Sequence, residues 1–165
     1  MLFAAALTTA AGAQERTIPQ SSAFLQLKQA IERQYYTYDR DRILPLLNRA
    51  QALIRQDGAN WYPYYYAGIL HVQLGNIARA DDKAAAHRYY TLAREHLEVA
   101  HRKSTSAETT LWMSAVYGKL ASLRTFKMIY YGARSKAFME DAYAMSRGNP
   151  KFFMRAGVHV MHTPA

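Results

Sequence analysis

The chain has 165 residues, a length that suits a single domain with one hydrophobic core. Hydrophobic residues make up 50% of it and charged residues 20%, which excludes a largely disordered protein. The net charge is +9 and there is no cysteine, so disulfide bonds, cysteine-based metal sites and a lipid-modified cysteine anchor are excluded.

The N-terminal segment, residues 1–13, predicts an export signal. "MLFAAALTTAAGA" has no charged side chain and ends in a small-x-small pattern of the kind that signal peptidase recognises. Its apolar run is shorter than the roughly 20 residues that span a bilayer. We therefore predict cleavage after Ala13, a flexible segment over 14–22, and a mature chain in the periplasm or the medium. A buried N-terminal helix is the alternative, because the usual Lys or Arg near the start is missing.

From Ala23 onward the sequence predicts helices throughout. Apolar residues recur at i, i+3, i+4 and i+7, and no alternating apolar and polar run persists. Asn60 is expected to cap one helix, with Pro63 in its first turn. The predicted fold is all-α, a right-handed stack of antiparallel helical hairpins in one domain over 23–163. We expect about seven helices, over residues 23–38, 41–56, 60–76, 83–103, 107–130, 133–146 and 149–162.

A packing pattern repeats along these predicted helices. Three alanines each follow a small or branched residue and a large one at the same spacing, and a glycine comes later in each copy. Spacings of about 50 and 40 residues between copies indicate a helical solenoid, in which small residues let neighbouring helices approach closely. The residues expected at these helix contacts are Ala50, Trp61, Gly68, Ala100, Trp112, Gly118, Ala142 and Gly157.

The repeated residues resemble the tetratricopeptide repeat family. The clearest first-helix motif is Phe153, Ala156 and Gly157, and the clearest second-helix motif is Ala93, Leu97 and Ala100. The resemblance covers about residues 23–163 and departs from the family in its longer repeats, which usually have about 34 residues. It implies a non-catalytic protein-interaction module that binds a peptide or partner helix in a concave groove.

The groove residues are predicted from polar and aromatic positions on the third and fifth helices. Packing between hairpins is the alternative for the tyrosines, and the spacing alone does not decide between the two. The candidates are Tyr62, Tyr65, Tyr66, His71, Tyr117, Arg124 and Lys127.

The end of the chain predicts a second mode of association. The sequence stops just after a first-helix motif, so an open solenoid end would expose apolar residues unless another chain covers them. The domain is therefore expected to be incomplete at its C-terminus or to form a homodimer through the last helix. The residues that would be covered are Met154, Val158 and Met161.

Catalytic and metal chemistry is not predicted. His159 and His162 form an i, i+3 pair, but two histidines make only half of a zinc site. No nucleophile elbow, phosphate-binding loop or dinucleotide fingerprint occurs. We expect no enzymatic activity and no cofactor.

The positive charge is concentrated in the second half of the chain. Up to Asp82, eight Lys and Arg face seven Asp and Glu, a balance of +1, and from Lys83 onward thirteen face five, a balance of +8. An acidic protein or peptide partner is therefore favoured. Export disfavours nucleic acid, and an anionic envelope surface would be bound only peripherally.

Overall fold

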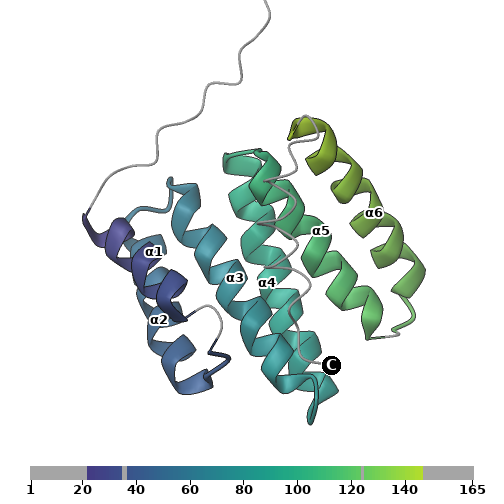
Figure 1. The fold of residues 1–165 in the computed structure, drawn as a ribbon, viewed down its shortest axis with the longest axis horizontal. Helices are drawn as coiled ribbons and strands as arrows, with labels where there is room; N and C mark the ends of the chain where they lie inside the picture. Colours follow the sequence, from purple (N-terminus) through teal and green to yellow (C-terminus); the bar gives the residue numbers. More distant parts are fainter. Residues whose placement is uncertain (1–21, 35–36, 124, 147–165) are drawn as a thin grey trace, which may run out of the picture.

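The computed structural model describes residues 22–34, 37–123 and 125–146, and all of its regular structure in these ranges is α-helical. The all-α prediction is therefore confirmed. The helices of the described ranges are α1 (Ser22–Gln34), α2 (Arg40–Gln56), α3 (Trp61–Ala78), α4 (Lys83–Lys103), α5 (Ala107–Ser122) and α6 (Met128–Met145) (Figure 1).

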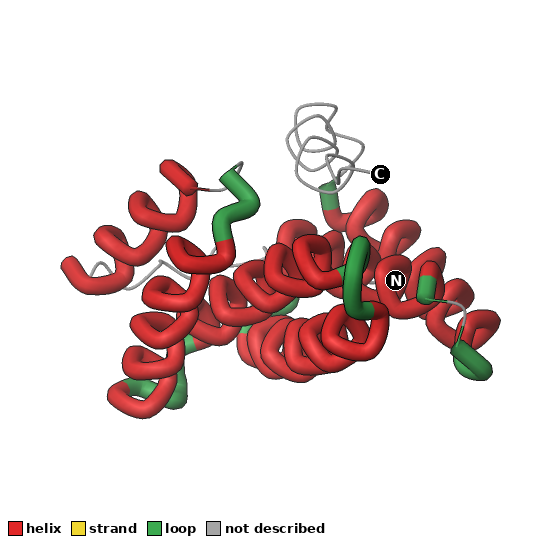
Figure 2. Tube along the Cα trace, turned by 90° about the horizontal axis from the view of Figure 1, so that it is seen from below, coloured by secondary structure: helices red, strands yellow, loops and turns green. Residues whose placement is uncertain are grey.

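Successive helices pack against one another in chain order (Figure 1). The links between them are short and run over residues 35–39, 57–60, 79–82, 104–106 and 123–127. The most extensive pairings join α3 to α4 and α5 to α6. Beyond the sequential pairs, α1 contacts α3 and α3 contacts α5, whereas within the described ranges α2 does not contact α4 and α4 does not contact α6. Helices α1, α3 and α5 thus form one row in which each helix contacts the next, and among the described residues α2, α4 and α6 do not contact one another. Figure 2 shows the helices side by side across the molecule.

Side-chain caps define where several helices begin. The Asn60 side chain accepts a hydrogen bond from the Tyr62 N–H at 3.0 Å, so the predicted cap of this helix is confirmed. Asp82 caps α4 in the same way through the Ala85 N–H at 2.8 Å. At the start of α5, Ser106 and Thr109 form a reciprocal capping box, which satisfies two N–H groups that have no partner within the helix.

Helix α3 is the central helix of the core. It contacts α1, α2, α4 and α5, and nearly every residue from Tyr62 to Gly75 is buried. A helix that is apolar on all sides is typically covered on all sides. Gly68 allows α4 to pack directly against the backbone of α3, because a Cβ added at this position would lie 2.5 Å from the Leu97 Cγ.

The boundary between α5 and α6 differs from the prediction. We expected one helix to continue to Tyr130 and the next to begin at Ala133, but α5 ends at Ser122 and α6 begins at Met128. The Ser122 hydroxyl donates to the Lys119 carbonyl at 2.7 Å, and this side chain competes with backbone donors in the last turn. The first helix also ends before Thr37, short of the predicted end at Tyr38.

Several predictions fall outside the described residues. These are the export signal over 1–13, the seventh helix over 149–162 with Gly157, and the C-terminal apolar residues. Of the helices in the described ranges, none is long and apolar enough to cross a membrane.

Candidate functional site

The tyrosines predicted to line a groove lie in the core. Tyr62, Tyr65 and Tyr66 are all buried, and the rings of Tyr62 and Tyr66 meet edge to face at 4.8 Å. Their partners include Trp61 on the same helix and Phe24 of α1, whose ring is 6.4 Å from that of Tyr62. The expectation that these side chains are exposed is wrong, because α3 is enclosed by its neighbours. They pack between helices instead.

Hydrogen bonds satisfy the buried hydroxyls of this cluster. The Tyr62 and Tyr66 hydroxyls are 3.2 Å apart, and the Tyr65 hydroxyl donates to the Glu108 carboxylate at the start of α5. Burial raises the pKa of Tyr66, and burial together with the Glu108 charge raises that of Tyr65. These phenols therefore stay protonated. The Tyr65 hydroxyl joins α3 to α5, whereas the Tyr62 and Tyr66 hydroxyls pair within α3.

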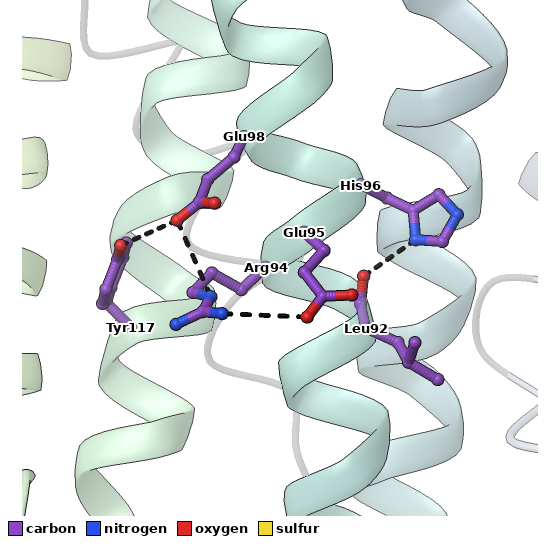
Figure 3. Close-up of polar contacts among 6 residues, drawn as sticks. All are labelled: Leu92, Arg94, Glu95, His96, Glu98 and Tyr117. Atoms are coloured by element: carbon purple, nitrogen blue, oxygen red, sulfur yellow. Dashed lines mark hydrogen bonds and ion pairs between the residues drawn. The ribbon is translucent and has the colours of Figure 1, made fainter.

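The predicted site residue His71 is also buried. Its Nδ1 lies 2.8 Å from the Ala67 carbonyl, which can only accept, so this nitrogen carries a proton. The imidazole stacks on that of His96 with centroids 5.0 Å apart, and His96 makes the same kind of bond to the Leu92 carbonyl at 2.8 Å (Figure 3). Burial lowers the pKa of His71 to about 4, so its ring is neutral near pH 7.

Tyr117 is a further buried residue among the predicted groove positions. Its hydroxyl donates to the Glu98 carboxylate of α4 at 2.9 Å, and Arg94 lies 3.6 Å from the same carboxylate (Figure 3). Burial and this carboxylate raise the pKa of Tyr117 to about 12. The expectation that Tyr117 and His71 are exposed is therefore wrong as well, because both make polar contacts between or within core helices.

The two predicted basic residues have different outcomes. Arg124 lies outside the described residues. Lys127 is exposed at the N-terminus of α6, where its ammonium lies 5.5 Å from the centre of the Phe126 ring.

The residues predicted at helix contacts lie mostly in the core. Three alanines have no exposed surface, Gly68 and Trp112 are buried, and Trp61 and Gly118 are partly buried. The three alanines are Ala50, Ala100 and Ala142.

An exposed apolar cluster stands at the turn between α5 and α6. Phe126 is 94% exposed and Ile129 is 83% exposed, and Met128 and Tyr130 beside them are also exposed. We call these four residues the α6 patch. Sequence reasoning missed the patch because it placed these residues inside a continuous fifth helix. The signal was the run of large apolar residues in "FKMIYY", in which Lys127 is the one charged residue.

The described residues contain no group of three or more His, Cys, Asp or Glu side chains that could hold a metal ion. Two basic residues lie near the patch in sequence: Lys127, the N-cap of α6, falls between Phe126 and Met128, and Arg134 follows Tyr130 by about one turn. The Arg134 guanidinium lies 4.7 Å from the centre of the Phe138 ring. The arrangement can bind an apolar segment that carries negative charge.

No protein-family model matches the chain, and no curated protein or solved structure resembles it significantly.

Proposed function

We propose that the protein is a non-catalytic, tetratricopeptide-like interaction module of the bacterial cell envelope that docks an acidic peptide or partner helix on the α6 patch. The short links, the sequential packing and the row of α1, α3 and α5 support a stack of helical hairpins. The export signal predicted over residues 1–13 supports the location.

The exposed α6 patch is the observation that carries this proposal. Monomeric proteins rarely leave large apolar side chains together in water, and such patches typically mark interaction sites. Burial of a fully exposed Phe or Ile side chain stabilises a complex by about 1.5–3 kcal/mol. Phe126 and Ile129 together therefore contribute about 3–6 kcal/mol, to which charge contacts with an acidic partner add.

Charge favours an acidic partner over a second copy of the chain. In a symmetric dimer the same patch faces itself, so Lys127 and Arg134 of one copy would approach those of the other. Like charges brought together across an interface destabilise it, whereas an acidic partner would gain from the same residues. Self-association through the terminal helices is the runner-up, and binding to an anionic envelope surface is the third alternative.

Peptide display on the full chain tests the proposal. We expect a random library to yield peptides rich in Asp and Glu with large apolar anchors. The double variant Phe126→Ser/Ile129→Ser should bind these peptides at least tenfold more weakly, since two apolar anchors are lost. The matched control is Leu25→Ser/Leu92→Ser, which removes two exposed leucines elsewhere and should bind normally.

Three results would contradict the proposal. The first is a library without enrichment, or peptides that bind the patch variant as tightly as the original chain. The second is a concentration-dependent dimer in light scattering that the patch variant abolishes, which would assign the patch to a second copy. The third is that the original chain sediments with anionic vesicles and the patch variant does not, which would assign the patch to binding of a membrane surface.

A further inference from the structure

An open cavity of about 270 Å³ lies where the end of α3 meets α5 and α6. It is separate from the α6 patch, and none of its lining residues belongs to that patch. Gly118 allows the close approach of α5 and α6 here, since an added Cβ would lie 3.2 Å from the Ser135 Oγ. The described residues that line the cavity are Arg79, Ser114, Ala115, Gly118, Lys119, Ser122, Ser135 and Met139.

Positive charge characterises this cavity. Among the described lining residues the only charged ones are Arg79, which directly follows α3, and Lys119 of α5. None of the ion pairs between described residues involves Arg79. Burial and the nearby Arg79 charge lower the pKa of Lys119 to about 8, so the ammonium is partly desolvated and repelled by its neighbour. An anion placed between Arg79 and Lys119 would interact favourably with both charges.

Serine oxygens form the polar part of the lining. The Ser114 hydroxyl donates to the Ser135 carbonyl at 2.8 Å, and the Ser135 hydroxyl donates to the Ser114 carbonyl at 2.9 Å. The Ser122 hydroxyl donates to the Lys119 carbonyl at 2.7 Å. Because each hydrogen is engaged in this way, these side chains can offer a ligand only oxygen lone pairs. A ligand that uses them must itself carry hydroxyl or N–H donors.

The size of the cavity limits the ligand. About 270 Å³ corresponds to roughly nine water molecules at about 30 Å³ each, which is enough for a small organic molecule and too little for a folded partner. Ala115 and Met139 provide an apolar wall for its carbon skeleton.

We propose that this cavity binds a small hydroxylated anion with one phosphate or carboxylate group. Arg79 and Lys119 bind the anionic group through charge-assisted hydrogen bonds, which are the strong ones in proteins. The serine oxygens accept from the ligand hydroxyls, and their fixed positions select against bare anions of the same charge.

Calorimetric titration of the full chain tests this proposal with named probes at constant ionic strength. Glycerol 3-phosphate and glycerate supply a phosphate or a carboxylate with hydroxyl groups, and inorganic phosphate and acetate supply the anionic group alone. We expect saturable binding of one hydroxylated probe, and the better of the two identifies the anionic group. The bare anions should bind more weakly because they cannot donate to the serine oxygens.

Charge variants locate the binding. Arg79→Gln and Lys119→Met should each weaken binding of the hydroxylated probe by roughly tenfold or more, since each removes a charged hydrogen-bond donor. The control Arg55→Gln removes one exposed positive charge of α2, outside the cavity, and should leave binding unchanged. Circular dichroism checks that each variant folds. Because Arg79 is exposed at the end of α3, Arg79→Gln still tests the proposal if Lys119→Met does not fold.

Two outcomes would overturn the proposal. One is the absence of saturable binding for all four probes at millimolar concentration. The other is binding that all three variants weaken equally, because an effect of overall charge would not distinguish the cavity residues from Arg55.

Discussion

Replacement of glycine by alanine at two helix positions separates packing strain from helix propensity. Gly68 of α3 faces α4, and an added Cβ would lie 2.5 Å from the Leu97 Cγ and 2.9 Å from its Cδ2. Gly132 of α6 has no described atom within 4 Å of such a Cβ. Both glycines are in helix interiors, so the propensity gain from alanine is common to the two variants.

The expected free energies differ in sign. Alanine in place of glycine in a helix interior stabilises by about 1 kcal/mol, so Gly132→Ala should raise the free energy of unfolding by that amount. At Gly68 the clash involves a branch carbon of Leu97, a fully buried side chain that cannot simply swing away. An extra methyl group in a packed core costs about 1–3 kcal/mol, so Gly68→Ala should be less stable than Gly132→Ala by about that range.

Urea unfolding followed by far-ultraviolet circular dichroism measures both variants. Gly118→Ala is an internal check. Among the described atoms its Cβ would meet the Ser135 Oγ alone, at 3.2 Å, so this variant should have an intermediate stability. A Gly68→Ala variant at least as stable as Gly132→Ala would refute the reasoning, since α4 would then not be held against the backbone of α3.

Three further predictions concern buried polar groups and a cap. Because burial lowers the pKa of His71 to about 4 while that of an unfolded histidine is about 6.5, the unfolded chain takes up the proton first as the pH falls through this window. The free energy of unfolding should therefore fall by up to about 3 kcal/mol from pH 7 to 4. Measured by urea unfolding, the His71→Gln variant should lose less stability over the same range, and a loss equal to that of the original chain would refute this. Ser106→Ala breaks the capping box with Thr109 and should destabilise by about 1 kcal/mol in thermal unfolding, and no change would show that the cap is dispensable. Tyr65→Phe removes the hydrogen bond to Glu108, an exposed residue that water can solvate, so urea unfolding should show a loss of only about 1 kcal/mol, and a loss above about 3 kcal/mol would contradict this.

Helix existence could be predicted from the sequence where local chemistry and periodicity agree. Asn60 caps α3 as expected, because an Asn side chain before an aromatic run satisfies helical N–H groups whatever lies around it. The break between α5 and α6 could not be found in this way, since no Gly, Pro or Asp interrupts residues 119–131. A Ser hydroxyl that bonds to the preceding turn ends α5, and this signal is common to many serines inside helices.

Which side chains are exposed to solvent was harder to predict than where the helices lie, and the tyrosines of α3 show why. A row of aromatics is compatible with either a binding face or a core, and the decision depends on how many neighbours a helix has. The uniform apolar character of α3 was the available signal, since an exposed groove helix would keep a polar side. The cavity depends on a pairing that no local pattern contains, because Arg79 follows α3 whereas Lys119 lies in α5.

The central position of α3 has a consequence for the order in which the molecule opens. In a stack whose elements contact mainly their neighbours, end helices can detach while the middle stays folded. Among the described helices, α1 contacts α2 and α3 alone, whereas α3 contacts four others. In hydrogen exchange, α1 amides should therefore exchange through local fraying, and α3 amides should exchange only when the whole domain unfolds. The buried tyrosines would then mark the last part of the chain to meet water.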